Sequence, residues 1–580
     1  MRLIQSKRRS PLGESPLRHF NLGDQVPGLV LGATAFFLLL LVGYPLLWLV
    51  LTSFGIPDDL SLSHIIRVFT DPRNLHPVEN TLLLAVGCGV GSIFLGVPLA
   101  WATARTDMPA RRAIQALVAM AYITPPYLTA LAYIILLGPQ AGYFNRLLRL
   151  FHLGPLDIFS MGGVIAVVTL HGFAYTYFLT YDALRSLDAP FSETARILGA
   201  SPFAVLRRIV LPLVAPGITG GALLAAVQAM ADFGPQAFLG LPARIVFLPT
   251  RIYGALGSYP PRWADTAAMS LVLILLTVAG LYAQRVYLER RSFVTVGGRG
   301  VRVERSSLGR WGWLALLGCL GIVFFSTIAP FGVLAAAAFS RNWTLPLAAG
   351  NLTLANFQTA LITDQVSSRG VLNSFGLAAG AATVGTLLGL FVSYLEQRTQ
   401  IRGRRLLDYL AGLPLGLPGT VMAFGMILAF IRPPFQFLYA TIWIILAAYV
   451  ARFVPLAVRT TSASLRQVDP VLEEAARITG ASWGRTLVRI LAPVLRSGLL
   501  TAWLLVFIPA LSELSATILL YTSGTETISV AIFRLSDLGQ FEPVAALAVF
   551  TIAVTLVAAG LLQWLGSRGG AQTVRELPVR

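Results

Sequence analysis

The sequence predicts an all-α polytopic membrane protein with about 12 transmembrane helices in two similar halves. Three observations support this fold class. First, 56% of the 580 residues are hydrophobic and 12% are charged, with a mean hydropathy of +0.73, which is too apolar for a soluble protein. Second, one long stretch occurs twice. Third, the net charge of +18 comes from arginines in short segments between apolar runs, a pattern typical of cytoplasmic loops that argues against a nucleic-acid partner.

Apolar runs of about 20 residues, the length that spans a bilayer, occur six times in each half of the chain. The expected spans are 27–53, 80–104, 114–137, 162–184, 213–231 and 266–288, then 312–339, 373–395, 406–431, 437–459, 494–512 and 544–566. We expect Pro330, Pro418 and Pro509 to kink or interrupt their helices. The first 26 residues are polar and basic, so we expect no cleavable signal peptide.

These spans divide the chain into five parts. They are a tail (1–26), a first half (27–288), a linker rich in Arg, Gly and Ser (289–310), a second half (311–566) and a second tail (567–580). The tails, the linker and both repeated stretches lie on the basic side of the topology, whereas alternate loops such as 54–79 are charge-balanced. Both termini are therefore predicted to be cytoplasmic.

The repeated stretch has the same internal spacing in both copies. The first reads Glu193-Thr-Ala-Arg-Ile-Leu-Gly199 and runs on to Pro212, and the second reads Glu474-Ala-Ala-Arg-Ile-Thr-Gly480 and runs on to Pro493. Each copy predicts two short helices joined by a tight turn. The glycine stands where a helix ends and the backbone must become left-handed, so we expect a positive φ at Gly199 and Gly480.

The duplication extends beyond this stretch. Asn80, Gly96 and Pro125 recur 293 residues later (373−80, 389−96, 418−125), whereas the repeated stretch recurs after 281 (474−193). The first half therefore holds about 12 extra residues, which we place in the external segment 139–161. Because each half has an even number of spans, the halves run in the same direction and are related by an axis along the membrane normal.

The repeated stretch resembles the EAA loop of permease subunits of bacterial ABC importers, which reads E-A-A, three residues, G, nine residues, I-x-L-P. Only Thr194 and Ala492 depart from that pattern. The resemblance implies two type I ABC permease halves in a bacterial inner membrane, a substrate-binding protein outside, and two cytoplasmic ATPase subunits that dock onto the two hairpins. The residues that it assigns to ATPase coupling are Glu193, Ala195, Gly199, Pro212, Glu474, Ala475, Ala476, Gly480 and Pro493.

The chain itself is not expected to be an enzyme or to carry a cofactor. A phosphate-binding loop needs a lysine after its glycines, and Lys7 is the only lysine. ATP and Mg²⁺ should therefore be bound by the partner ATPase. The five histidines have no spacing that suggests a metal site, and Cys88 and Cys319 lie singly in apolar runs as packing residues.

Two pairs of polar residues at repeat-equivalent positions are candidates for the substrate path. Asp232 and Glu513 (513−232 = 281) each end an apolar run, about 24–27 Å from the cytoplasmic motif. His171 and Arg452 (452−171 = 281) form the second pair. Alternatively, the acids cap or pair at the interface, with Arg244 or Arg251 nearby, and the second pair is satisfied by packing and snorkelling.

The fused two-half chain looks most like the permeases of ferric-iron importers, through segments 231–234 and 513–520. Permeases for thiamine or aminoethylphosphonate share this layout, and polyamine permeases are more distant. Fe³⁺ prefers oxygen ligands, which Asp232 and Glu513 supply, whereas Arg452 suits an anion. A secondary transporter or a channel is the alternative from another class, but neither accounts for two ATPase-docking hairpins.

Overall fold

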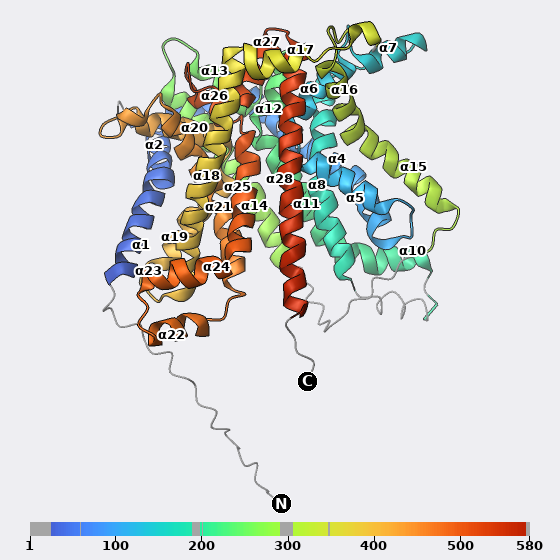
Figure 1. Cartoon of the computed structure of the whole chain (residues 1–580). Coiled ribbons are helices and arrows are strands. Elements are labelled where there is room, and N and C mark those ends of the chain that lie inside the picture. Colours follow the sequence, from blue (N-terminus) through green and yellow to red (C-terminus); the bar gives the residue numbers. More distant parts are fainter. Residues whose placement is uncertain are drawn as a thin grey trace, which may run out of the picture.

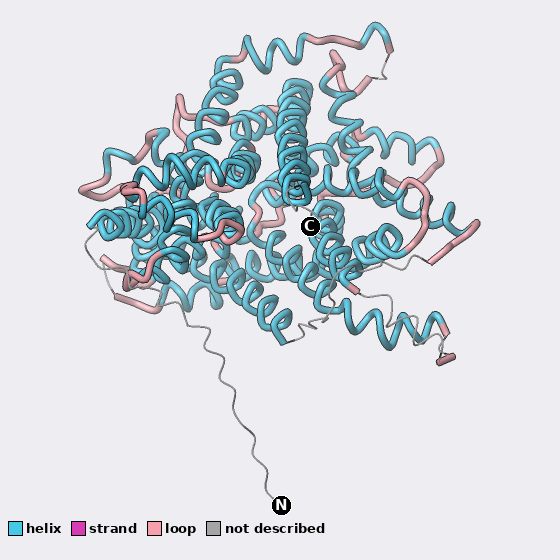
Figure 2. The backbone as a smooth tube through the Cα atoms, turned by 60° about the horizontal axis from the view of Figure 1, so that its bottom comes forward, coloured by secondary structure: helices cyan, strands magenta, loops and turns pink. Residues whose placement is uncertain are grey.

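The computed structural model describes residues 25–57, 60–187, 198–199, 201–290, 306–345 and 348–575. Within these ranges the regular elements are helices, shown in Figure 2, and the β-structure is limited to two isolated bridges. Nine helices in the described ranges are long and apolar enough to cross a membrane, or up to 12 if each of three bent pairs counts as one span. The predicted all-α membrane fold is confirmed.

The spans of the first half contain ten helical segments. They are α1 (Gln25–Leu38), η1 (Leu39–Gly43), α2 (Tyr44–Ser53), α4 (Pro72–Arg105), α5 (Arg111–Ile123), α6 (Pro126–Leu137), α8 (Met161–Ser186), η2 (Leu206–Val210), α11 (Leu211–Ala231) and α14 (Trp263–Arg290). Shorter elements connect them, namely α3 (Ser63–Thr70), α7 (Tyr143–Leu150), α10 (Pro202–Val205), α12 (Phe233–Pro235), η3 (Gln236–Gly240) and α13 (Leu248–Leu256).

The second half repeats this order. Its spans are built from α15 (Trp311–Val323), η4 (Phe324–Ile328), α16 (Ala329–Ala338), α18 (Gln365–Arg398), α19 (Arg404–Gly412), η7 (Leu413–Gly416), α20 (Gly419–Phe430), α21 (Ile442–Leu465), α23 (Trp483–Thr486), η9 (Leu487–Leu491), α24 (Ala492–Val494), α25 (Arg496–Leu511) and α28 (Phe541–Arg575). The connecting helices are η5 (Ala349–Asn351), α17 (Ala355–Gln358), η6 (Thr359–Thr363), η8 (Gln436–Leu438), α22 (Val471–Ile478), α26 (Thr517–Leu520) and α27 (Ile528–Asp537).

The third span of each half is broken at a proline. α5 and α6 meet at 102° beside Pro125, and the chain bends by 117° between Gly416 and Gly419, beside Pro418, so the predicted interruption at Pro418 is confirmed. Pro509, in contrast, lies inside α25, which continues to Leu511 without interruption. Pro330 is the second residue of α16, which follows directly after the π-helix η4.

Each repeated stretch leads into its span through a π-helical turn. η2 and η9 are both five residues long and begin 281 residues apart (487−206), and Pro212 and Pro493 follow them. A proline cannot donate to the carbonyl one turn back, and a widened turn accommodates that missing bond. The second copy then bends by 79° between α24 and α25, whereas η2 and α11 form one continuous span.

The second span shows the duplication most clearly. α4 and α18 are each 34 residues long, and each is capped by an aspartate, Asp71 or Asp364 (364−71 = 293). Gly96 and Gly389 lie where these helices cross α8 and α21. A Cβ on Gly96 would come within 2.9 Å of the Phe173 carbonyl oxygen, and one on Gly389 within 2.8 Å of the Ala457 carbonyl carbon. Glycine is therefore needed for both crossings.

The first span of each half packs against the other half. Leu38, Leu41 and Val42 are buried in a core cluster that consists mainly of α18–α21 and α25 residues. In the opposite direction, the Tyr133 hydroxyl of α6 donates to the Phe325 carbonyl of η4 at 2.6 Å. Figure 1 shows α1 beside α19, α2 beside α20, and α15 on the far side beside α5. The halves are interlocked by this exchange.

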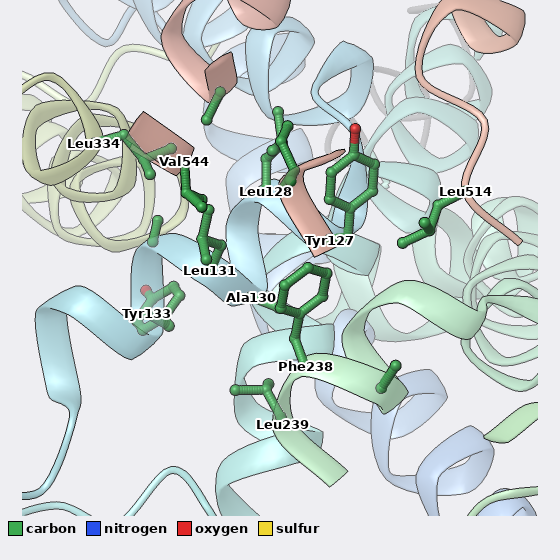
Figure 3. Packing of buried hydrophobic residues seen from close by; sticks show 14 of the residues in the cluster. Tyr127, Leu128, Ala130, Leu131, Tyr133, Phe238, Leu239, Leu334, Leu514 and Val544 are labelled. Atoms are coloured by element: carbon green, nitrogen blue, oxygen red, sulfur yellow. The ribbon is translucent and has the colours of Figure 1, made fainter. Parts of the chain in front are cut away.

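A large core cluster also joins the two halves through the broken spans. Tyr127 of α6 stacks on Phe238 of η3, with ring centroids 6.1 Å apart. Leu514 and Val544 of the second half belong to the same buried cluster. Figure 3 shows Leu514 beside Tyr127, and Val544 on the side of Leu131. Side chains from both halves therefore fill this core.

The described part of the linker is attached to the first half. The Asp107 carboxylate accepts hydrogen bonds from the backbone N–H of Leu308 and the Ser307 hydroxyl, each at 2.8 Å. These hydrogen bonds, the one from Leu308 foremost, lower the pKa of Asp107 below its usual value. Residues 291–305 of the predicted linker lie outside the described residues.

α10, α22 and the beginning of α1 lie at one end of the bundle, with the end of α28 (Figure 1). α12, α13, α26 and α27 lie at the opposite end. The two repeated stretches therefore share one end of the molecule, as the duplication requires.

Candidate functional site

The second repeated stretch forms the predicted pair of short helices, α22 and α23. The Asp469 carboxylate accepts from the Val471 N–H at 3.0 Å, which satisfies a donor at the start of α22. Gly480 has φ +81° and its N–H donates to the Arg477 carbonyl at 2.9 Å. The predicted left-handed glycine is confirmed here and at Gly199, where φ is +84°. Glu193 and Ala195 lie outside the described residues.

A buried glutamate attaches this hairpin to the long helix α18. Glu473 is 3% exposed, and its carboxylate accepts from the Tyr394 hydroxyl at 3.0 Å. Arg398 Nε lies 3.2 Å from the same carboxylate, and Arg477 lies 3.7 Å from it. The Tyr394 ring also contacts Trp483 of α23 edge-on, at 5.7 Å between centroids. Both short helices are thus held against one side chain of α18.

The motif instead points to the neighbouring residue, Glu474. In the structure Glu474 is exposed, and it is Glu473 that makes the buried contacts. Ala475 is also exposed and Ala476 is buried. Two adjacent glutamates look alike in the sequence, and only the position of Tyr394 and Arg398 at the end of α18 distinguishes them.

Repeat-equivalent arginines make similar contacts in the two halves. Arg398 donates to the carbonyl of Val468, and Arg105 (398−105 = 293) donates to the carbonyl of Leu187 at 2.9 Å. Leu187 and Val468 are themselves equivalent (468−187 = 281). The position equivalent to Glu473 is Ser192, so the buried carboxylate has no counterpart in the sequence of the first half.

The candidate acids Asp232 and Glu513 each end the fifth span of their half. Asp232 accepts from the Gly234 N–H at 3.1 Å, and Glu513 accepts from the Ala516 N–H at 2.8 Å. Ser515 follows Glu513 and accepts from the Phe233 N–H at 3.4 Å across the two halves. The structure therefore brings the two acidic segments together where the halves meet.

Glu513 has an arginine partner, but it is neither of the two suggested by sequence proximity. Arg452 Nη1 lies 3.2 Å from Glu513 Oε1, and Glu513 is 7% exposed. Arg251 instead donates to the Asn74 side chain at 3.3 Å. Arg452 is the repeat equivalent of His171, so both candidate pairs converge on this place in the fold.

His171 and Asp232 line one cavity of about 40 Å³ in the first half. Its other polar lining residues include Gln228, Gln236 and Tyr175, from α11, η3 and α8. His171 is 8% exposed, and its Nδ1 has no hydrogen-bond partner among the described residues. The described residues contain no group of three or more His, Cys, Asp or Glu side chains suited to a metal.

The family model of binding-protein-dependent transport system inner membrane components matches residues 92–294 and 371–569. The chain belongs to this family. One match lies mainly in each half, without its first span, and the two matches include both repeated stretches. The protein is therefore a multi-pass membrane permease of the ABC importer type, with two family domains in one chain.

Similar proteins include ferric-transport permeases. The permease is 27% identical to the putative ferric transport system permease protein FbpB 1 of Haemophilus influenzae over 495 residues, 84% of this chain and 77% of that protein. It is 25% identical to the ferric transport system permease protein FbpB of Actinobacillus pleuropneumoniae over 547 residues, 92% of this chain and 78% of that protein. A putative 2-aminoethylphosphonate transport system permease protein PhnV of Salmonella choleraesuis is 28% identical over 253 residues, 43% of this chain and 93% of that protein.

Gly419 makes room for the arginine of the permease's buried ion pair. A Cβ at this position would lie 1.6 Å from Arg452 Nη1 and 2.8 Å from the Ser515 Cβ. The equivalent position in the first half is Pro126 (419−126 = 293), which lines the same cavity as the smaller His171. The guanidinium can reach Glu513 in this way only because position 419 has no side chain.

We expect Gly419→Ala to lower the stability of the permease by about 1–3 kcal/mol, since overfilling a packed site displaces the guanidinium from Glu513. Thermal unfolding of the purified protein in detergent measures this change. Gly412→Ala is the matched control, because no atom lies within 4 Å of the Cβ position there. Equal melting temperatures for the two variants would contradict the account of Gly419.

Proposed function

We propose that this permease forms the translocation path of an ATP-driven, binding-protein-dependent importer for ferric iron. The proposal rests on the share of the chain that aligns with each relative. The two ferric-transport relatives align over 84% and 92% of the chain, through both halves. The phosphonate relative aligns over 43% of it. Thiamine, 2-aminoethylphosphonate and polyamine are the alternative cargoes, and a secondary transporter or channel is the alternative class.

The hairpin of α22 and α23, which we call the coupling hairpin, has properties that suit docking to an ATPase. Val471, Leu472 and Ile478 of α22 are exposed apolar side chains at the end of the bundle that the arginine distribution predicts to be cytoplasmic. Glu473 attaches the hairpin to α18, which runs to the opposite end of the molecule. A displacement of the hairpin by a partner would therefore be transmitted along a rigid helix to the external end.

Two ATPase subunits would supply the energy, one at each repeated stretch, and would bind ATP and Mg²⁺. A substrate-binding protein would deliver the cargo at the end that carries α12 and α26 (Figure 1). In this arrangement both termini are cytoplasmic and the chain lies in the inner membrane of a bacterium.

The charges where the halves meet favour a cationic cargo. Arg452 was the one feature that suited an anion, and its guanidinium lies 3.2 Å from Glu513. Asp232 remains as a carboxylate that is partly exposed and lines a cavity. Carboxylate oxygen is the ligand type that Fe³⁺ prefers. Asp232, with His171 and the Glu513–Arg452 pair around it, is the part of the path that we assign to cargo passage.

Uptake into proteoliposomes tests this function. The permease is reconstituted with its ATPase and its binding protein, and radiolabelled ferric iron, thiamine, 2-aminoethylphosphonate and a polyamine are compared. We expect ATP-dependent accumulation of iron alone. Accumulation of another cargo without iron would refute the ferric assignment, and accumulation without ATP would refute the importer class.

A further inference from the structure

The two halves neutralise their equivalent acids differently. In the second half, Glu513 faces the guanidinium of Arg452, which lies over Gly419. In the first half the equivalent residues are Asp232, His171 and Pro126, and all three line the same cavity of about 40 Å³. The cavity is therefore the counterpart, in the first half, of the region that the Arg452 side chain fills in the second.

The cavity is lined by side chains that can bind a cation. Gln236 is 1% exposed, and its Nε2 donates to the carbonyls of Ala229 and Met230 at 2.7 and 3.3 Å. These bonds fix the amide so that Oε1 is left as an acceptor, and Oε1 has no hydrogen-bond partner among the described residues. His171 Nδ1 likewise has no hydrogen-bond partner among the described residues. Buried polar atoms of this kind are costly unless a ligand or water satisfies them.

We propose that this cavity binds one small inorganic cation, held by the Asp232 carboxylate and Gln236 Oε1, with His171 Nδ1 as a third ligand. The cation provides for Asp232 the positive charge that Arg452 provides for Glu513. A volume of about 40 Å³ accommodates an ion with one or two waters, since a single water needs roughly 10–15 Å³. Carboxylate and amide oxygens suit hard cations.

The proposed function assigns no ion-binding site, so this cavity goes beyond it. The ion that the cavity binds has two possible sources. It is either the cargo in transit or a monovalent ion from the bulk that stabilises the contact between the halves. A single carboxylate gives weak binding, which a transit site needs so that the ion can leave. The chemistry of the ligands is common to both sources, and the choice of probe ion separates them.

The test uses the full-length permease in lipid nanodiscs. Thermal stability is measured against Na⁺, K⁺ and Ga³⁺ supplied as citrate, with N-methylglucamine citrate as the control for ionic strength and chelator. Ga³⁺ stands for Fe³⁺ without its redox chemistry. We expect saturable stabilisation by at least one of these ions. Saturation by Ga³⁺ identifies a cargo site, and saturation by Na⁺ or K⁺ identifies a resident ion.

Two variants and one control complete the experiment. Asp232→Asn should weaken the ion's apparent affinity at least about tenfold. His171→Arg combined with Pro126→Gly rebuilds the arrangement of the second half and should remove the ion dependence while the protein stays folded. Asp408→Asn, which changes an exposed carboxylate on α19, should leave the ion dependence unchanged.

The proposal is overturned if no probe ion stabilises the permease saturably, or if Asp232→Asn responds to the ion as the unmodified protein does. Its failure is distinguishable from failure of the ferric assignment. If an ion binds saturably but the reconstituted importer takes up no iron, the ferric assignment is rejected and the cation site stands. If iron is taken up but no ion binds saturably, the cation site is rejected and the ferric assignment stands.

Discussion

Replacing Gly480 with valine should abolish the cargo-stimulated ATPase activity of the assembled importer while the permease still inserts into the membrane. Gly480 has φ +81°, which a β-branched residue adopts only with strain of about 1–3 kcal/mol. The surrounding space is open, so the effect arises from the backbone and not from a clash. A distorted turn would move α22 relative to α23 and change the surface that the ATPase contacts.

Gly484→Val is the matched control for this variant. Gly484 lies inside α23, also has no atom within 4 Å of its Cβ position, and has no positive φ. Valine has a higher helix propensity than glycine, so we expect Gly484→Val to cause no loss of helix stability in α23. Normal stimulated activity in Gly480→Val, or an equal loss in both variants, would contradict a role for the left-handed turn in coupling.

Arg452→Gln should lower the stability of the permease by about 3–5 kcal/mol, because it leaves the Glu513 carboxylate in a buried place without its counter-charge. The measurement is the unfolding midpoint of the purified protein in a fixed detergent. Removing both charges, as Arg452→Gln with Glu513→Gln, should recover most of that loss. If the double variant is as unstable as the sum of the single variants, the two side chains are not energetically coupled.

The features of the repeated stretches and of the acidic pair that depend on local backbone rules were predictable from the sequence. A glycine at the end of a short helix predicts a left-handed turn, and Gly199 and Gly480 both have one. The fixed offset of 281 predicts equivalent places for Asp232 and Glu513, and both acids cap the segment that follows their span. The turns and the caps need only residues near one another in the chain, and the repeat places them equivalently in the two halves.

Features that depend on contacts between distant segments were not predictable. Hydropathy identifies residues 114–137 and 406–431 as single spans, and Pro418 predicts an interruption in the second of them. The size of the bends, 102° and 117°, was not predictable, because it depends on how the two segments of each span pack. The Glu513–Arg452 pair joins residues on α21 and after α25, whereas sequence proximity suggested Arg244 or Arg251. The exchange of first spans between the halves also depends on packing, because equally apolar helices carry no sequence signal for their neighbours.

Because the chain contains the repeated stretch twice, we expect one copy of it to bind two ATPase subunits without a second permease chain. Native mass spectrometry of the complex, purified with its ATPase from membranes, tests it most directly. The duplication predicts one copy of this chain, whose mass is 62.4 kDa, with two copies of the ATPase subunit. A complex that contains two copies of this chain, or one copy with a single ATPase at saturating ATPase concentration, would contradict it.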